Sequence, residues 1–348
     1  MPQRSEQITT DRAFARLGLI LAFYAFIAIG MAEGGLGVLL PSIMQTFYLT
    51  PATVTLLFLS QITGYLVAAF TSSLLSNQMG LARMLLLASS LLTIALIIGA
   101  LLDPAIATTL LGMYLPWRIV YLVFASVVGL LVAGMIWAIA TDYKPLNKQV
   151  TVSGGDARAN LRTTLGTPAV LVSGLLLLVY VGTEVSIGNW AYSVQTISRK
   201  TPETIAGYSI SAYWMGLTIG RMGMGYLIKR LGTVRTIDLS LTLLMVGLLC
   251  WWLLPNGVLS LPVLGFALAA IFPITMLLVP QRVAAPLVPA AIGFLTSVAS
   301  LGAASIPTGV GFLANWFGLS IIPILMLPLA ALMMLLHRWL VRRLALIS

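Results

Sequence analysis

The sequence predicts an all-α membrane protein, a bundle of about ten transmembrane helices. Of its 348 residues, 59% are hydrophobic and only 8% are charged, and the mean hydropathy is +1.03. Apolar runs of roughly 20 residues, the length that carries a helix across a hydrocarbon core, follow one another along almost the whole chain. Short segments of alternating hydrophobicity, which membrane β-strands would require, are not found in the sequence. These observations exclude a soluble domain and favour a helical bundle.

Proline, glycine, asparagine and charged residues bound the apolar runs, so that each run is assigned as one span. With the N-terminus inside, fifteen Lys and Arg residues fall in or beside the cytoplasm, and only Arg118, Arg199 and Lys200 fall outside. This distribution follows the positive-inside rule. It predicts a multi-pass protein of the cell membrane, inner or plasma, with both termini in the cytoplasm. The predicted spans are residues 15–40, 52–75, 84–102, 117–140, 168–193, 204–228, 236–254, 259–279, 287–313 and 319–341.

The longest polar segment divides the spans into two groups. We interpret residues 141–167 as a cytoplasmic linker between an N-terminal bundle of four spans, residues 1–140, and a C-terminal bundle of six, residues 168–348. A net charge of +10 would suit a nucleic-acid partner, but the basic residues lie in short loops between spans. Membrane topology explains them, and no nucleic-acid partner is predicted.

An internal repeat relates the two groups. TPATV, which starts at Thr50, matches TPETI, which starts 151 residues later at Thr201, and Glu33 matches Glu184 at the same offset. In both copies the Thr-Pro pair suits a helix start, because a threonine N-cap is followed by a residue with no N–H to satisfy.

The repeat has a gap before the fourth span. Trp117 matches Trp316 at an offset of 199, whereas Gly80 matches Gly232 at 152, a jump of 47 residues. This is about the length of one two-helix hairpin. The N-terminal bundle is therefore predicted to lack its fourth and fifth helices. In the alternative interpretation, residues 103–116 form an external re-entrant loop of an unrelated ten-helix fold.

Two loop motifs carry a resemblance to a known family. The segment GRMGMGYLIKRLGTVR, residues 220–235, resembles the signature loop of the major facilitator superfamily, and SLLSNQMGLAR, residues 73–83, is a weaker first-half copy. YVGTEVSIGNW, residues 180–190, is similar to the seventh helix of the sugar-permease branch, which includes fucose and glucose/galactose transporters. The resemblance implies two pseudo-symmetric halves and alternating-access transport. The residues at motif positions of the loops are Asn77, Gly80, Arg83, Gly225, Arg230, Gly232 and Arg235.

Two acidic residues are the strongest candidates for chemistry. Glu33 and Glu184 lie near the middle of their predicted spans, where a charged carboxylate costs about 2.5–3.5 kcal/mol on insertion scales. Because the repeat relates them, they are expected to face one another at the midplane, bind a polar solute and exchange a proton. The alternative is a protonated carboxyl bonded to the backbone of a neighbouring helix.

Aromatic and amide side chains complete the predicted solute site. Gln61 and Tyr213 occupy repeat-equivalent positions, and Asn189, Trp190 and Trp214 add amide donors and flat apolar faces. For Trp190 and Tyr192 we favour the alternative of an interfacial anchor. Arg221 is expected to snorkel or cap helix carbonyls, and His337 to be a solvated residue at a helix end.

These patterns predict a secondary transporter of a small polar or amphipathic solute, sugar-like or drug-like, with the lipid bilayer as its environment and protons as a candidate coupling ion. The alternative is a degenerate, non-transporting membrane protein that lost its gate with the hairpin. With one histidine, one cysteine and no nucleotide-binding motif, neither an enzyme nor a bound cofactor or metal is predicted.

Overall fold

The computed structural model describes residues 36–61, 63, 90, 125–126, 129–130, 133, 136, 162–254 and 257–345. Several predicted features lie outside these residues. They are Glu33, the first-half loop motif with Asn77, Gly80 and Arg83, and the shortened segment 103–116. The chain divides into two compact units. The second unit joins residues 40–63 to residues 154–348 and contains almost all of the described residues.

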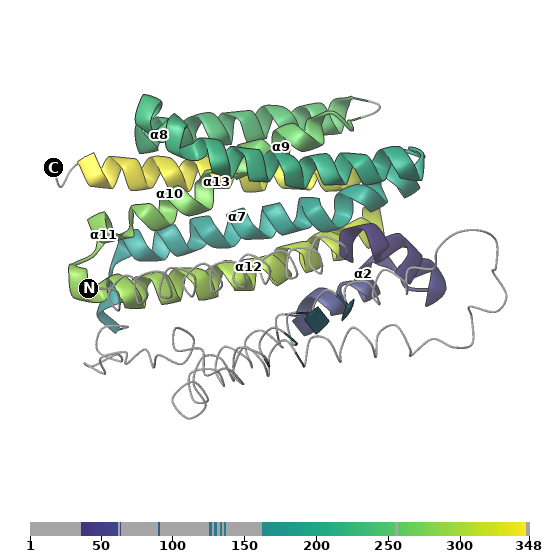
Figure 1. The fold of residues 1–348 in the computed structure, drawn as a ribbon, viewed down its shortest axis with the longest axis horizontal. Coiled ribbons are helices and arrows are strands. Elements are labelled where there is room, and N and C mark those ends of the chain that lie inside the picture. The colour runs from purple at the N-terminus through teal and green to yellow at the C-terminus, as the bar shows by residue number, and fades with distance from the viewer. Residues whose placement is uncertain are drawn as a thin grey trace, which may run out of the picture. The chain divides into compact units, whose positions relative to one another are not determined.

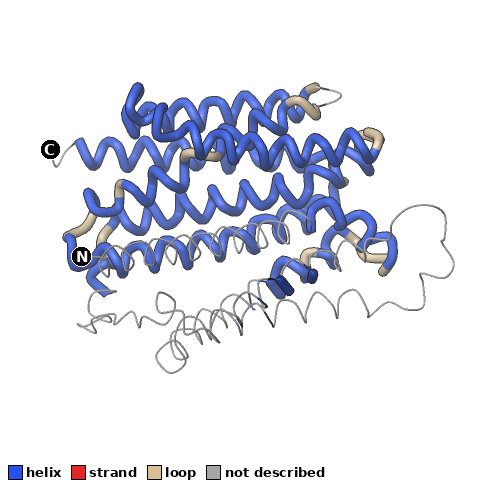
Figure 2. Tube along the Cα trace, viewed as in Figure 1, coloured by secondary structure: helices blue, strands red, loops and turns tan. Residues whose placement is uncertain are grey.

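All of the regular structure in the described part of the chain is helical (Figures 1 and 2). Five of the described helical segments are long and apolar enough to cross a membrane. They are residues Pro168–Ser198, Glu203–Leu253, Ser260–Leu277, Ala285–Phe317 and Leu319–Arg343.

The first of these segments begins with α7 (Pro168–Ser193), which continues without interruption into the π-helical turn η1 (Val194–Ser198). Most residues of the second half of α7 are buried on all sides. A helix that is apolar around its whole circumference belongs in the interior of a bundle. In Figure 1, α7 accordingly runs through the middle of the coloured helices.

Helix α8 (Glu203–Leu253) consists of two legs. Its 51 residues would span about 76 Å at 1.5 Å per residue, more than twice a hydrocarbon core of about 30 Å. Gly232, with φ of 79°, breaks the helical conformation, and the two legs run in opposite directions in Figure 1. A positive φ favours glycine, which has no Cβ to clash with the following carbonyl. The two legs, residues 203–231 and 233–253, correspond to the predicted spans 204–228 and 236–254.

The remaining helices complete the C-terminal bundle. Helices α9 (Ser260–Leu268) and α10 (Ile271–Leu277) together make one membrane-length segment, and the short α11 (Val279–Arg282) and η2 (Ala285–Leu287) follow it. The last two long helices are α12 (Val288–Phe317) and α13 (Ile322–Ala345), joined by η3 (Leu319–Ile321).

Glycines allow the helices to pack closely. A Cβ at Gly302 of α12 would lie 2.1 Å from the carbonyl oxygen of Leu178 on α7. A Cβ at Gly265 of α9 would lie 2.0 Å from the carbonyl oxygen of Tyr213 on α8. Because a membrane supplies no hydrophobic force between helices, such close contact of small residues provides much of their attraction.

The segment 40–63 packs on the end of the C-terminal bundle opposite Gly232. It contains the end of the helix Leu36–Thr46 and the short helix α2 (Pro51–Val54), which contacts α12. The predicted cap at Thr50 is confirmed, since its Oγ1 accepts the backbone N–H of Thr53 at 3.2 Å. The matching prediction for Thr201 is wrong. There the helix begins at Glu203 after Pro202, without a side-chain cap.

Candidate functional site

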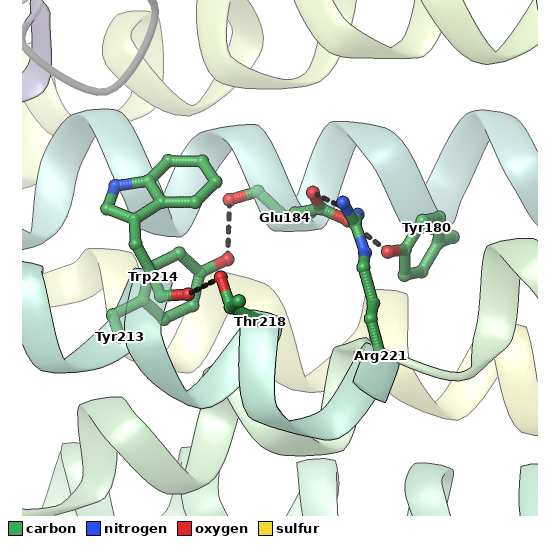
Figure 3. A network of polar contacts seen from close by, with 6 residues as sticks. All are labelled: Tyr180, Glu184, Tyr213, Trp214, Thr218 and Arg221. Carbon is green, nitrogen blue, oxygen red and sulfur yellow. Dashed lines mark hydrogen bonds and ion pairs between the residues drawn. The ribbon is translucent and has the colours of Figure 1, made fainter. Parts of the chain in front are cut away.

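Glu184 lies at the centre of a polar network between α7 and the first leg of α8 (Figure 3). Its side chain is 12% exposed, and its Oε1 lies 3.3 Å from the Nη2 of Arg221, with which it forms an ion pair. The Tyr180 hydroxyl, one helical turn away, donates a hydrogen bond to Oε2. The Tyr213 hydroxyl donates to the main-chain carbonyl of Glu184 at 2.9 Å. Both carboxylate oxygens therefore have donors, as a buried carboxylate requires.

The position of Arg221 corrects the prediction made for it. Arg221 neither snorkels nor caps its helix, but reaches across to α7 and holds Glu184. The first leg of α8 continues for ten residues beyond Arg221, about 15 Å, so the pair lies well inside the membrane-spanning length. Sequence analysis missed the partnership because the two residues are 37 positions apart on different helices. The signal available in the sequence was Arg221 itself, a second charged residue inside an apolar run, which requires a counter-ion.

Trp214 lies beside the ion pair on the same leg of α8. Its indole packs on Gly188 of α7, where a Cβ would lie 2.8 Å from the indole Cζ2 atom. The Tyr213 and Trp214 rings meet edge to face, with centroids 5.2 Å apart. The Thr218 hydroxyl donates to the Trp214 carbonyl at 2.9 Å. Trp214, Thr218 and Arg221 follow one another along one face of the helix, as their spacing of four and three residues requires (Figure 3).

The other predicted solute contacts are not part of this network. Asn189 is buried. Trp190 is fully buried, and its Nε1–H donates to the Pro307 carbonyl at 3.1 Å. The Phe58 ring meets the Trp190 indole edge to face with centroids 6.0 Å apart. An interfacial anchor would face lipid headgroups, so that alternative is wrong for Trp190. Gln61 is exposed.

The second-half loop motif surrounds the turn between the two legs of α8. Gly232 forms that turn, and Arg235 is exposed just after it. The Arg230 guanidinium lies 5.4 Å from the centroid of the Tyr226 ring. Gly225 has open space where a Cβ would be, so packing does not demand glycine there.

A second charged cluster lies at the Gly232 end of the bundle. Asp238 on the second leg of α8 pairs through Oδ1 with His337 at 3.3 Å and with Arg338 at 3.4 Å, both on α13. His337 is only 2% exposed, which corrects the prediction of a solvated histidine. It is buried because α13 packs against both α7 and α8.

Arg282, after α10, adds a contact to α7 at the same end of the bundle. It donates from Nη1 to the Ser173 hydroxyl at 2.7 Å. Burial, which disfavours the charged form, lowers the pKa of Arg282 to about 10. The guanidinium therefore still carries its charge at neutral pH.

A cavity of about 570 Å³ lies at the other end, away from Glu184. The segment 41–51 forms one wall, and the junction from Tyr192 to Glu203 forms the other. Lys200, with φ of 56°, turns the chain at this junction. Among the described residues, no group of three His, Cys, Asp or Glu side chains could hold a metal ion.

Comparison with known proteins places this geometry in a known fold. No protein-family model matches the chain. The sequence is 22% identical over 394 residues to the Bypass of stop codon protein 6 of Saccharomyces cerevisiae, covering 89% of this chain and 79% of the yeast protein. It is 30% identical over 102 residues to the glucose/mannose transporter GlcP of Bacillus subtilis, covering 28% of this chain and 25% of GlcP.

The crystal structure of the nucleoside transporter NupG has the same fold. It matches with a TM-score of 0.73 at 10% sequence identity, over 94% of this chain and 99% of NupG. The predicted fold class, a helical membrane bundle of the major facilitator type, is therefore confirmed. The chain is a multi-pass membrane protein with the fold of a membrane transporter.

Proposed function

We propose that the chain is a secondary active transporter, which moves a small polar or amphipathic solute across the cell membrane by alternating access. The observation that carries the proposal is the Glu184–Arg221 ion pair, buried between two helices of a transporter fold. A charged pair at this depth is costly to maintain, and such groups in membrane helices mark solute or proton pathways. The glucose/mannose and nucleoside transporters that the chain resembles act on small polar solutes, as their names state.

The proposed domain organisation is two bundles, residues 1–140 and 168–348, connected by a cytoplasmic linker at 141–167. The side chains proposed to contact solute are Glu33, Gln61, Glu184, Asn189, Trp190, Tyr213 and Trp214. Proton coupling is assigned to the repeat-related acids Glu33 and Glu184. The turn at Gly232, with its flanking arginines, lies in the cytoplasm in this orientation, and it takes part in rocking the second bundle. Arg338, Arg342 and Arg343 at the end of α13 support the orientation through the positive-inside rule.

Uptake into proteoliposomes tests the proposal. The purified protein is reconstituted, and uptake and counterflow of radiolabelled neutral and anionic small solutes, among them glucose, uridine and glucuronate, are followed at several external pH values. Wild-type protein should give flux that rises as the external pH falls, and Glu184→Gln should lose this pH dependence. Glu203→Gln is the matched control, because Glu203 is exposed in the first turn of α8. Flux in Glu184→Gln that equals wild type at every pH would remove Glu184 from the mechanism.

One observation supports the second candidate function, a non-transporting relative of such transporters. The alignment with the yeast protein runs over 394 positions but covers only 89% of the 348 residues of this chain, about 310, so the yeast protein has residues at about 80 positions where this chain has none. That deficit leaves room for a two-helix hairpin of about 40 residues, which we propose is missing before Trp117. A folded, monodisperse protein that gives no counterflow with any solute would favour the non-transporting form.

A further inference from the structure

We propose that the transported solute is an organic anion carried together with one proton, and that Arg221, on the exposed side of its pair with Glu184, binds the carboxylate of that anion. This inference rests on the proposed transport function and names the substrate class for the same site.

The two partners of the ion pair differ in how they can lose their charge. A carboxyl group becomes neutral by taking up a proton, whereas a guanidinium keeps its proton at every physiological pH. If a proton binds Glu184, the charge of Arg221 is left without a counter-ion. An unpaired charge is unfavourable at this depth, so Arg221 then requires another anion.

No other described acid is placed to supply that counter-ion. Tyr180 and Tyr213 are the titratable groups that face Glu184 from α7 and α8, and both are hydroxyl donors to it. Helices α9, α10 and α12, which contact α7, carry no ionisable side chain, and α11 carries only Arg282, which binds Ser173. On α13, which also contacts α7, His337 and Arg338 are paired with Asp238. Within the described residues no second acid faces Arg221, so we assign this role to the carboxylate of the solute.

The exposure of the two side chains favours access to Arg221. The Arg221 side chain is 47% exposed, while that of Glu184 is only 12% exposed. One edge of the guanidinium contacts Glu184, and its five N–H donors are more than that contact can use. A carboxylate can therefore approach Arg221 from the exposed side.

The same face of α8 indicates the rest of the solute. Thr218, an exposed residue, offers a hydroxyl oxygen between Arg221 and Trp214, and the Trp214 indole offers a flat apolar face (Figure 3). Arg221 lies seven positions after Trp214, about 10 Å along the helix axis. This length fits an acid with one ring or one short hydroxylated chain, such as a sugar acid, better than a long fatty acid.

The charges of the site determine how much net charge each transport cycle moves across the membrane. Before binding, the pair has no net charge; after binding, a neutral Glu184 and an Arg221–carboxylate pair again have none. When the solute leaves on the other side, the proton leaves Glu184 and the original pair forms again. Transport of a monoanion with one proton is therefore electroneutral. A cationic solute would leave Arg221 beside a like charge, and the site should reject it.

Matched solutes in proteoliposomes test the inference. The probes are D-glucuronate with D-glucose, and nicotinate with nicotinamide, in which each anion has a neutral counterpart of similar shape. The anion of at least one pair should enter with internal acidification and should accumulate under an inward proton gradient. A potassium potential set with valinomycin should leave that uptake unchanged.

Variants distinguish binding of the solute carboxylate by Arg221 from a purely structural role of this residue. Arg221→Gln should lower anion uptake about tenfold or more, because it removes a charge-assisted contact, and Arg221→Lys should restore part of it. Glu184→Gln should retain anion counterflow but lose proton-driven accumulation. Arg342→Gln, which removes a charge from the exposed end of α13, is the matched control and should transport like wild type.

Three results would overturn the inference. Uptake of glucose or nicotinamide but not of its anion, with Arg221→Gln equal to wild type, would contradict the anion assignment while the transport function stands. Anion uptake that responds to membrane potential as a charged movement would contradict one-to-one proton coupling. No flux, and no thermal stabilisation of the wild-type protein by any of the four probes, would contradict both this inference and the proposed function.

Discussion

The two charged clusters of the C-terminal bundle use similar residues in different ways. In the middle of the bundle, one carboxylate on α7 has one cationic partner on α8, and the Tyr180 hydroxyl supplies its other bond. At the Gly232 end, one carboxylate on α8 is shared by two neighbouring residues of α13. Because Asp238 has two partners on α13, it still connects the two helices when one of those partners is removed. Among the described residues, the Glu184–Arg221 pair has no such second partner, so neutralising either residue leaves the other charge uncompensated. A proton that binds Glu184 can therefore drive a step in a transport cycle.

The largest effect is expected from breaking the central pair. Glu184→Ala leaves Arg221 without its counter-ion and should lower stability by about 3 kcal/mol, at the low end for a broken buried pair because Arg221 is half-exposed. Thermal unfolding in detergent measures this loss. The double variant Glu184→Ala with Arg221→Ala should recover much of it. If the double variant is no more stable than Glu184→Ala, the unpaired arginine is not the cause.

A smaller effect is expected at the Gly232 end. Asp238→Asn keeps the size of the side chain but removes the charge shared by His337 and Arg338, and should cost about 1 kcal/mol in the same assay. Transport per folded molecule should not change. Arg338→Gln, in which the side chain is 54% exposed, should change stability by less than about 0.5 kcal/mol. Loss of uptake in Asp238→Asn without loss of folded protein would contradict a structural role for this cluster.

The smallest effect on stability is expected beside the pair, at Gly188. A Cβ there would lie 2.8 Å from Trp214, so Gly188→Ala should shift the indole and raise KM for the transported solute about threefold, with little change in Tm. Gly207→Ala, where nothing lies within 4 Å of the added methyl group, is the control on α8. Equal KM values for the two variants would show that the position of the Trp214 ring does not affect solute binding.

Features that depend on one short segment of the chain could be predicted from the sequence. The six predicted spans of residues 168–348 coincide with the described helices because apolar length alone decides whether a segment can cross a membrane. The positive φ at Gly232 falls within the motif identified from sequence. The Thr50 cap was predictable because all of its atoms lie within one helical turn. At Thr201 the same dipeptide makes no cap, since the preceding helix continues through a π-turn and alters the entry to α8.

The sequence by itself determined that this is a helical membrane protein, where the long helices of residues 168–345 begin and end, and that a carboxyl group lies deep in one of them. Those properties depend on hydrophobicity and on neighbours a few residues away. Only the tertiary structure decided which charge balances Glu184, that His337 is buried, and that Trp190 faces the protein. These depend on contacts between helices far apart in the chain, where the rotation of each helix selects which side chains meet.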